Sequence, residues 1–351
     1  MYIAYSEEQE TLRRDLRAYY NELLTPEIRE ELHHGHGVGR TMRAVVKRMG
    51  ADGWLGIGWP KEWGGQGRSQ VEQFIFFDES MRAGAPVPIL TINTVGPTIM
   101  RHGSEDQKRF FLPQILKGEI HFCIGYTEPN AGTDLASLKT RAVRDGDDYV
   151  VNGQKVFTTL ASDADYIWLA TRTNPDVPKH EGISMLAIDL KTPGIRVDPM
   201  HLLSEHDINT VFFDDVRVPV TTLVGKENQG WRLITSQLNH ERVTLCSAGL
   251  LAQAYEETVA WARATESAEG GRVIDQEWVQ IGLARVHAGL EFLRLINWKV
   301  AWTGTQGRLD VADASTIKVF GTEFYLESFR ILMDIIGPRA YLPRGPPDVI
   351  G

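Results

Sequence analysis

Two short runs of the sequence carry residue types suited to a planar, oxygen-rich ligand. The first spans residues 126–134 and reads Tyr-Thr-Glu-Pro-Asn-Ala-Gly-Thr-Asp; its backbone N–H groups and hydroxyls suit an anionic or carbonyl-rich group. The second spans residues 153–159 and reads Gly-Gln-Lys-Val-Phe-Thr-Thr, an aromatic ring beside two hydroxyls. An isoalloxazine ring needs an apolar surface and hydrogen bonds to its carbonyls and N5. Together, the two runs predict a flavin site, and we name residues 126–134 the flavin turn and residues 153–159 the flavin strand.

A candidate catalytic base comes from helical spacing further along the chain. Positions 231, 234, 238, 241, 245 and 248 recur at steps of three and four, which places them on one stripe of a helix. Glu241 is the only charge on that stripe, and a carboxylate on a buried face is usually paired, neutralised or directed at a functional cavity. The adjacent Arg242 lies about 100° round the helix and points to a different face, so it is not automatically the partner of Glu241. From spacing alone, two interpretations of Glu241 are equally good: a catalytic base, or a salt-bridged Glu at the rim of a helix bundle.

The periodicity divides the chain into three parts. Residues 1–120 predict a helical domain, in which Ser6 with Gln9 and Ser104 with Gln107 form capping boxes. Residues 121–225 contain short β runs without intervening helices, which predicts an antiparallel β-barrel or sandwich carrying the flavin site. Residues 226–351 predict a bundle of three long helices, separated by glycine-rich punctuation. The expected fold class is therefore α+β with three domains.

Composition narrows the class of protein. The chain has 351 residues, of which 42% are hydrophobic, and its net charge of −9 argues against nucleic acid or an anionic membrane as a partner. No apolar run approaches the roughly 20 residues of a spanning helix, and the N-terminus does not resemble a signal peptide. We therefore expect a cytoplasmic enzyme, in which Cys123 and Cys246 are small buried hydrophobes without a function.

Two other patterns are similar to a dinucleotide-binding loop and to a metal site, but the residues around them support neither. The glycines of residues 35–39 have the wrong spacing for a dinucleotide loop and no strand before them. Nothing near His33, His34 and His36 supplies a convincing carboxylate or thiolate to complete a tetrahedral metal site. We expect a loop there, and no metal.

The flavin turn and the flavin strand resemble the two signatures of the acyl-CoA dehydrogenase family, Thr-Glu-Pro-x-Ala-Gly-(Ser/Thr)-Asp and Gly-x-Lys-x-(Trp/Phe)-x-Thr. Further similar segments are residues 212–219, Phe-Phe-Asp-Asp-Val-Arg-Val-Pro, and the Gly225 to Trp231 entry to a long helix. The resemblance extends from Ser6 to about Gly337. It implies the family's architecture, a helical domain, a β domain and a helix bundle, with FAD as the cofactor.

The resemblance also implies roles for individual residues. In the family, the turn bonds the flavin ring and the pyrophosphate, while the strand contributes an aromatic face and a bond to the N5 or O4 edge. Carried over to this chain, the cofactor-binding residues are Tyr126, Thr127, Gly132, Thr133, Phe157 and Thr159. Many relatives have Trp at the position of Phe157, so this chain offers less area but the same apolar character.

The implied reaction is the α,β-dehydrogenation of an acyl-CoA thioester. One branch of the family, that of isovaleryl- and long-chain-type enzymes, has its base in this helix as a Glu followed by Arg, which Glu241 and Arg242 match. The base takes the α proton while the β hydrogen leaves as hydride to flavin N5 on the opposite face of the acyl chain. The product is the trans-2-enoyl-CoA.

Three departures from the family pattern stand out. Thr265, Ala268 and Glu269 occupy the positions of Arg, Phe and Gly in the Arg-x-x-Phe-Gly loop of homotetrameric relatives, where the Arg reaches a neighbour's pyrophosphate. The chain stops at Gly351, before the Gly-Gly-Thr-x-Glu-type loop that normally contributes the amide for the thioester oxygen, so the bundle is expected to be incomplete. Residues 206–209 lack the usual Arg-x-Ser acyl-CoA contacts.

Within the family, the likeness is strongest to actinobacterial subunits that act on steroid side-chain CoA thioesters, through residues 59–67, 126–138 and 238–243. Those enzymes are heterotetramers, so the expected partners are an acyl-CoA substrate, a second acyl-CoA-dehydrogenase-like subunit and an electron-transfer flavoprotein as acceptor. Two alternatives stay open, a flavin-dependent acyl-CoA oxidase and a non-catalytic structural subunit.

Overall fold

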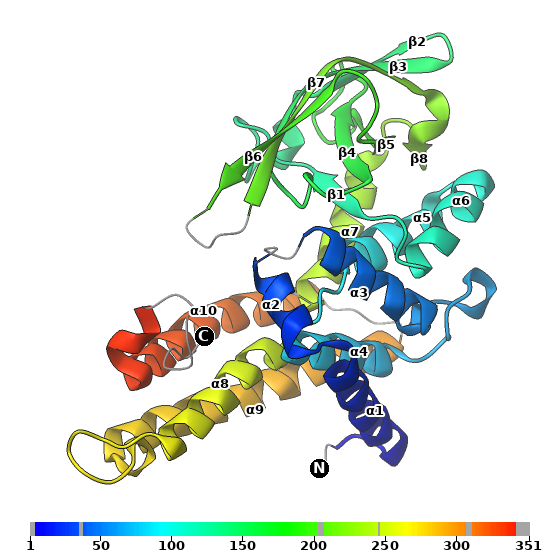
Figure 1. Ribbon diagram of the computed structural model, residues 1–351. Coiled ribbons are helices and arrows are strands. Elements are labelled where there is room, and N and C mark those ends of the chain that lie inside the picture. The colour runs from blue at the N-terminus through cyan, green and yellow to red at the C-terminus, as the bar shows by residue number, and fades with distance from the viewer. Residues whose placement is uncertain (1–3, 35–37, 203–206, 245, 307–310, 342–351) are drawn as a thin grey trace. The chain divides into compact units, whose positions relative to one another are not determined.

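The computed structural model describes residues 4–34, 38–202, 207–244, 246–306 and 311–341, and at residues 34, 207, 238–244, 311 and 314 it describes the backbone alone (Figure 1). Its α-helices are α1 (Glu7–Leu23), α2 (Pro26–His34), α3 (Arg40–Ala51), α4 (Gln70–Ala83), α5 (Gly96–His102), α6 (Glu105–Leu116), α7 (Gly230–Thr244), α8 (Ala248–Ala264), α9 (Glu277–Thr305) and α10 (Val311–Ile336). A π-helical turn, η3 (Leu90–Val95), leads directly into α5.

Side chains that satisfy the first backbone N–H groups begin several of these helices. Both predicted capping boxes are confirmed: the Ser6 N–H donates to Gln9 at 3.0 Å and the Gln9 N–H donates back to Ser6 at 3.2 Å, and Ser104 with Gln107 repeats the pattern. A third box, Ser69 with Glu72, begins α4. Each box satisfies two N–H groups that have no partner within the helix.

The chain forms two compact units. One comprises Met1–Leu23, Ser69–Ala85 and Arg242–Gly351, and so contains α1, α4, α8, α9 and α10; the other comprises Leu24–Arg68 and Pro86–Glu241. The second unit therefore holds the sheet, four helices of the N-terminal region and most of α7. The N-terminal helices contribute to both units.

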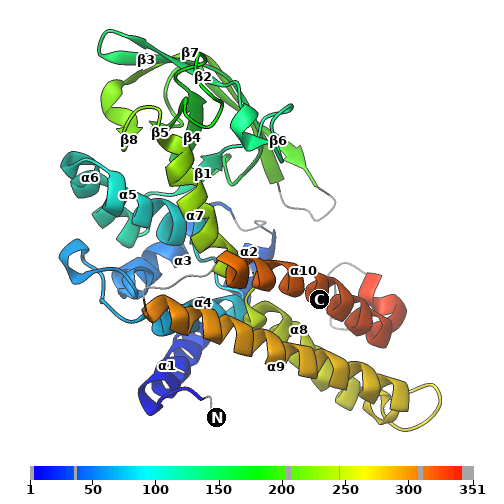
Figure 2. The same cartoon turned by 180° about the vertical axis from the view of Figure 1, so that it is seen from behind.

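In the first unit, α8, α9 and α10 pack against one another around Leu, Val and Ile side chains (Figure 2). The approach of α9 to α10 is close enough to require Gly289, where a Cβ atom would lie 2.1 Å from the Phe324 ring. On α4, the buried Glu79 carboxylate accepts from Arg13 at 3.0 Å and from Arg17 at 2.7 Å. Its neighbour Asp78 accepts from the Gly249 N–H at 3.0 Å and thereby caps α8.

The second unit is built on one eight-stranded sheet. Its strands are β1 (Phe122–Gly125), β2 (Arg141–Asp145), β3 (Asp148–Thr159), β4 (Tyr166–Arg172), β5 (Ile183–Asp189), β6 (Ile195–His201), β7 (Asp207–Pro219) and β8 (Leu223–Val224). The strand order is β6-β7-β3-β2-β4-β5-β8, with β1 paired to β4. Most pairs are antiparallel, as expected, but β1–β4 and β2–β4 are parallel.

The long β3–β7 ladder changes register twice, between Val151 and Gly153 and between Lys155 and Thr158. Such irregularities bend a strand and redirect its side chains. The second of them spans the aromatic position of the flavin strand, so the departure from regular pairing falls where the sequence predicts ligand contact.

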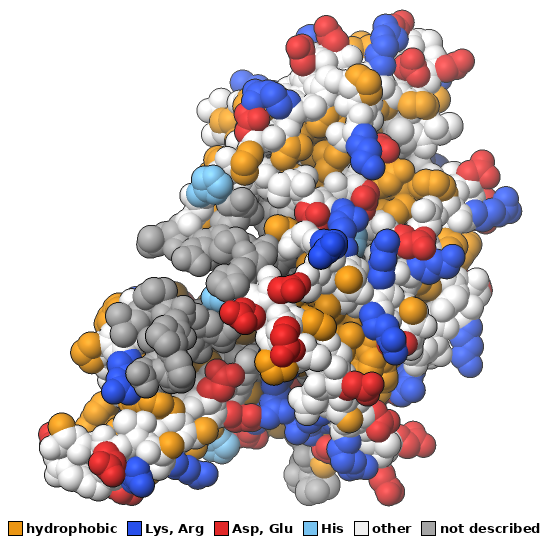
Figure 3. Space-filling view, in the orientation of Figure 1, with side chains coloured by type: hydrophobic (Ala, Val, Ile, Leu, Met, Phe, Trp, Pro, Cys, Tyr) orange, Lys and Arg blue, Asp and Glu red, His pale blue; other side chains and the backbone are white. Residues whose placement is uncertain are grey.

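The predicted fold class is confirmed: helices, then a mainly antiparallel β region, then long helices. None of the described helices has the length and apolarity that crossing a bilayer requires. On the face drawn in Figure 3, acidic and basic side chains are interspersed, and neither sign forms a continuous patch there.

Candidate functional site

The flavin turn is organised around the buried carboxylate of Glu128. The Glu128 N–H donates to the Ala131 carbonyl at 3.0 Å, and the Ala131 N–H donates to the Glu128 carbonyl at 3.1 Å, which closes the turn. The Glu128 side chain accepts from the backbone N–H of Lys139 at 2.6 Å and of Thr140 at 2.8 Å. These bonds attach the turn to the chain that leads into β2.

Lys155 joins the flavin turn to the flavin strand. Its side chain is fully buried, and its Nζ donates to Glu128 Oε1 at 2.8 Å and to the Tyr126 carbonyl at 3.0 Å. The next residue, Val156, donates its backbone N–H to the Thr127 carbonyl at 2.9 Å. Three bonds therefore hold two segments, 27 to 29 residues apart in sequence, side by side.

Both partners of this pair keep their charges at neutral pH. Burial lowers the pKa of Lys155 to about 8, against the opposing effect of Glu128, and a pKa of about 8 leaves the ammonium protonated at pH 7. Burial alone would raise the pKa of the Glu128 carboxyl, but the Lys155 ammonium and the backbone donors bring it below its usual value. The turn is therefore fixed by a buried, hydrogen-bonded ion pair.

Phe157 is presented on an unusual backbone. Its φ is 57°, in the left-handed region that L side chains rarely adopt, and 62% of the residue is exposed. The following Thr158 is buried, and the Asn209 side chain of β7 donates to the Thr158 carbonyl at 3.0 Å. Left-handed backbone at a non-glycine residue costs about 1–3 kcal/mol and gathers at ligand-binding sites. An exposed ring held in this way suits stacking on a planar ligand.

Three hydroxyls of the predicted set are available to a ligand. Among the described residues, no side-chain hydrogen bond involves Thr127, Thr133 or Thr159, and Thr133 and Thr159 are exposed. At Gly132 a Cβ atom would meet only Thr127 Cγ2, at 3.9 Å, so the protein leaves open space above that glycine. Free hydroxyls, an exposed ring and an open glycine on the anchored turn and the flavin strand fit a flavin and its pyrophosphate.

The predicted helix of the candidate base is present as α7, but it ends at Thr244, so Ala248 of the predicted stripe begins the next helix, α8. Its N-terminus packs closely on β5, since a Cβ atom at Gly230 would lie 3.0 Å from Ser184 Cα. Of the stripe positions whose side chains are described on α7, Ile234 is buried and Trp231 is half-buried; Leu233, next to the stripe, is buried as well. Glu241 and Arg242 lie within α7, but their side chains fall outside the described residues, so their predicted roles stay predictions.

One buried residue that the sequence analysis missed links α7 to the flavin turn. Gln237 is 3% exposed, and its Oε1 accepts from the Tyr126 hydroxyl at 2.6 Å and from the Trp168 indole N–H at 3.1 Å. Its position, three and four residues after Ile234 and Leu233, would have revealed it as a polar residue on the buried side. The sequence does not show that its partners come from β4 and the flavin turn.

The structure describes most of the residues at which the sequence departs from the family pattern. Thr265 ends α8, with its N–H donating to the Trp261 carbonyl at 2.9 Å, and Ala268 and Glu269 are exposed in the loop that follows. Asn209 anchors the flavin strand, whereas His206 lies outside the described residues.

Among the described residues, no group of three or more His, Cys, Asp and Glu side chains is arranged to hold a metal ion. Cys123 and Cys246 are buried free thiols.

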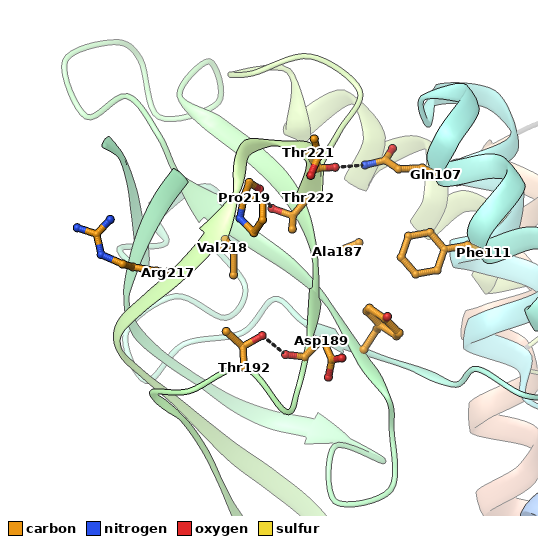
Figure 4. Close-up of a pocket in the computed structure, with 11 residues that line it drawn as sticks. Gln107, Phe111, Ala187, Asp189, Thr192, Arg217, Val218, Pro219, Thr221 and Thr222 are labelled. Carbon is orange, nitrogen blue, oxygen red and sulfur yellow. Dashed lines mark hydrogen bonds between the residues drawn. The ribbon is translucent and has the colours of Figure 1, made fainter. Parts of the chain in front are cut away.

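A cavity of about 290 Å³ lies elsewhere in the second unit, between α6 and residues of β4, β5 and β7 (Figure 4). Figure 4 shows Phe111 and Gln107 of α6 on one side, and Ala187, Val218 and Pro219 on the other, while Arg217 points away. Gln107 donates to the carbonyls of Thr221 at 2.7 Å and Leu223 at 2.9 Å, which ties α6 to β8. None of the predicted site residues lines it, so we assign no chemistry to it.

Comparison with known proteins gives three family matches along the chain. Residues 6–119, 123–216 and 228–349 match the models of the acyl-CoA dehydrogenase N-terminal, middle and C-terminal domains. The acyl-CoA dehydrogenase FadE26 of Mycobacterium tuberculosis is 52% identical over 360 residues, which cover 100% of this chain and 90% of the relative.

The chain is also similar over its whole length to solved structures. The ChsE4-ChsE5 complex from Mycobacterium tuberculosis is similar with a TM-score of 0.93 and 53% identity. The structure described as the Tcur3481-Tcur3483 steroid ACAD is similar with a TM-score of 0.93 and 47% identity. In both cases the match covers 100% of this chain and 90% of the matched chain.

Breaking the buried pair should destabilise the flavin turn. We expect Lys155→Met to lower the free energy of unfolding by about 3–5 kcal/mol, because it leaves the Glu128 carboxylate buried without its partner. Denaturant unfolding measures the loss. The control is Lys179→Met, which breaks the exposed Lys179–Asp134 pair and should cost at most about 1 kcal/mol. Equal effects of the two substitutions would contradict the anchoring role.

Proposed function

The chain belongs to the acyl-CoA dehydrogenase family, and from that membership we propose that it uses Glu241 to dehydrogenate a steroid side-chain acyl-CoA thioester within a heteromeric complex. As a member of this family it is an oxidoreductase that acts on acyl-CoA, and its cofactor is FAD. When bound, FAD supplies the acceptor for the hydride that leaves the β carbon. The residue roles, the steroid substrate and the partner subunit are proposals.

The exposed, left-handed Phe157 is the observation that carries the cofactor site. Its ring would lie along the flavin plane, with the hydroxyl of Thr159, two residues further on, beside the ring's edge. On the flavin turn, Thr127 and the backbone of Tyr126 would bond the ring, and Thr133 would bond the pyrophosphate above the open position at Gly132. The Glu128–Lys155 pair holds both segments in place, and Lys155 also donates to the Tyr126 carbonyl.

Glu241 is the proposed base. Its carboxylate would accept the α proton of the thioester, while the neighbouring Arg242 completes the Glu-Arg pair of the family branch. A general base must be within reach of the proton that it takes, so α7 has to be fixed relative to the flavin turn. Gln237 supplies that connection, since it lies four residues before Glu241 on the helix and accepts from the Tyr126 hydroxyl.

The substrate class rests on the relatives. A structure described as a steroid ACAD is 47% identical over the whole chain. At such identity, corresponding helices form the pocket walls of the two proteins, which supports a steroid side-chain CoA thioester as the substrate.

A cytoplasmic location agrees with the net charge of −9 and two unpaired, buried thiols. An electron-transfer flavoprotein is the proposed electron acceptor, as the family resemblance implies.

Two features of the first unit support a partner subunit. The loop after α8 has Thr265 where homotetrameric relatives have the pyrophosphate-binding Arg, so another subunit has to provide that cation. The long helices also carry large exposed apolar side chains on one side each, within about 120° of the helix circumference at 100° per residue. These are Trp278, Ile281, Phe292, Leu295 and Trp302 of α9, and Val319 and Leu326 of α10. Aromatic and aliphatic patches of this kind mark protein interfaces.

The intact flavin site favours a catalytic subunit over a structural one. A subunit kept only for its interface has no need of the buried Lys155–Glu128 pair, of unpaired hydroxyls, or of a strained exposed ring. Each of these costs stability in the absence of a ligand. Their joint presence on one turn and one strand supports FAD binding by this chain.

Phe157→Gly separates ligand binding from folding. Glycine adopts a φ of 57° without strain, so we expect the apoprotein's free energy of unfolding to stay within about 1 kcal/mol of the wild type. Loss of the ring should raise the Kd for FAD at least about 10-fold, because an aromatic contact and its buried area disappear. Flavin fluorescence titration measures the Kd. Phe157→Trp, which keeps an apolar face, should bind FAD as well as the wild type; an unchanged Kd in Phe157→Gly would rule out the stacking role.

Glu241→Gln tests the base. The amide keeps the shape of the carboxylate but does not accept the α proton, so turnover should fall by about 10²–10⁴-fold while FAD content is preserved. Reduction of bound FAD by a saturated acyl-CoA under anaerobic conditions measures the chemical step. If the variant reacts at nearly the wild-type rate, the base is another residue.

The partner proposal predicts that the chain expressed alone retains FAD poorly and lacks activity. Both should recover on co-expression with a homologous subunit that carries Arg at the position of Thr265, because Arg meets the two charges of a pyrophosphate bidentately. Trp278→Lys with Trp302→Lys should abolish co-purification, whereas Val143→Lys, at an equally exposed apolar position of β2, should not. An active homotetramer of the single chain with one FAD per subunit would contradict the proposal.

A further inference from the structure

The hydrogen bonds of Gln237 fix the orientation of its amide. The Trp168 indole nitrogen is only a donor, and it lies 3.1 Å from Gln237 Oε1, so the oxygen of the amide has to face Trp168. The Tyr126 hydroxyl donates to the same oxygen at 2.6 Å. The NH₂ end of Gln237 must therefore point away from both partners.

That NH₂ group meets no protein acceptor. Gln237 Nε2 is buried and has no hydrogen-bond partner among the described residues, and the same holds for Thr94 Oγ1. Gln237 and Thr94 are 3% and 1% exposed. A buried donor without a partner costs about 1–3 kcal/mol, so such groups are retained where something else satisfies them.

Gln237 and Thr94 line the same small cavity. It has a volume of about 30 Å³, lies between the η3–α5 segment and α7, and is also lined by Pro97, Arg101 and Leu233. A space of that size admits one oxygen-sized group. Arg101 contributes a positive charge to the lining, which favours the negative end of a dipole.

The backbone around Thr94 is specialised as well. Thr94 lies in η3, a π-helical turn that continues directly into α5, and its carbonyl accepts from the Thr98 hydroxyl at 2.8 Å. Widened turns of this type are rare and frequent at functional sites. The π-helical turn is thus a second observation, independent of Gln237, that marks this cavity.

The cavity adjoins the proposed reaction site. Gln237 bonds Tyr126, the residue before Thr127 of the flavin turn, and position 241 follows Gln237 by one helical turn, about 6 Å along the axis. A group in the cavity is therefore close to both the cofactor site and the helix that carries the proposed base.

We propose that this cavity recognises an acceptor oxygen, that of a ketone, on the acyl moiety of the substrate, with Gln237 Nε2 and Thr94 Oγ1 as its donors. The inference rests on the proposed function and makes these two residues determinants of specificity. A methylene at the same point leaves up to three donor hydrogens unpaired, and sites built to bond an oxygen discriminate strongly against analogues that lack it.

The test compares octanoyl-CoA with 4-oxo-, 5-oxo- and 6-oxo-octanoyl-CoA on the FAD-loaded complex with its partner subunit. At least one keto thioester should bind about 10-fold more tightly than octanoyl-CoA. Thr94→Val should reduce that preference several-fold. Gln237→Glu, which keeps the acceptor for Tyr126 and Trp168 but replaces the NH₂ donor, should abolish it. Ser328→Ala removes another buried, unpaired hydroxyl, in α10, and should leave the preference unchanged.

The inference is wrong if no keto thioester binds more tightly than octanoyl-CoA, or if a crystal structure of the keto complex shows only a water molecule between Thr94 and Gln237. It is also wrong if Thr94→Val and Ser328→Ala change the preference equally. Failure of the proposed function has a different signature, because then no saturated thioester, neither octanoyl-CoA nor a steroid side-chain CoA, reduces the FAD of the wild-type complex.

Discussion

The buried ion pair between Lys155 and Glu128 is the interaction on which the proposed flavin site depends. Removing two charges from water is costly, and such a pair survives only when its remaining hydrogen-bonding groups are also satisfied. Here Glu128 accepts two backbone N–H groups in addition to the ammonium, and Lys155 also donates to the Tyr126 carbonyl. These bonds join the turn to the chain that follows it and to the flavin strand, so the pair fixes a geometry rather than adding generic stability.

This anchoring accounts for the strained residue beside it. The Lys155 side chain is held by the buried Glu128, and the Thr158 carbonyl is held by Asn209 of the neighbouring strand. The register irregularity falls between Lys155 and Thr158. Phe157 is confined between two fixed points, and this over-determination is what a left-handed non-glycine residue requires to persist. The same confinement fixes the backbone from which the exposed ring projects, and an exposed ring suits stacking on a planar ligand.

The sequence predicts local features of this molecule better than the contacts between distant segments. The capping boxes at Ser6 and Ser104 and the switch from helical to β periodicity follow from neighbouring residues, and the structure confirms them. The flavin motifs place Glu128 and Lys155 within a few residues of the ligand groups, but their pairing is a tertiary contact that no periodicity encodes. The parallel pairing of β4 with β1 and β2 is missed for the same reason.

Helix α7 is where these separate constraints meet. Close packing at Gly230 fixes its start against β5, and the acceptor oxygen of Gln237 fixes its middle against Tyr126 and Trp168. A helix held at two points two turns apart has little freedom to rotate or slide. Lys155 donates to the Tyr126 carbonyl, and the Tyr126 hydroxyl donates to Gln237 of α7. The turn and the helix therefore share one chain of hydrogen bonds. The position of residue 241 relative to the flavin turn is thereby a consequence of groups that themselves perform no chemistry.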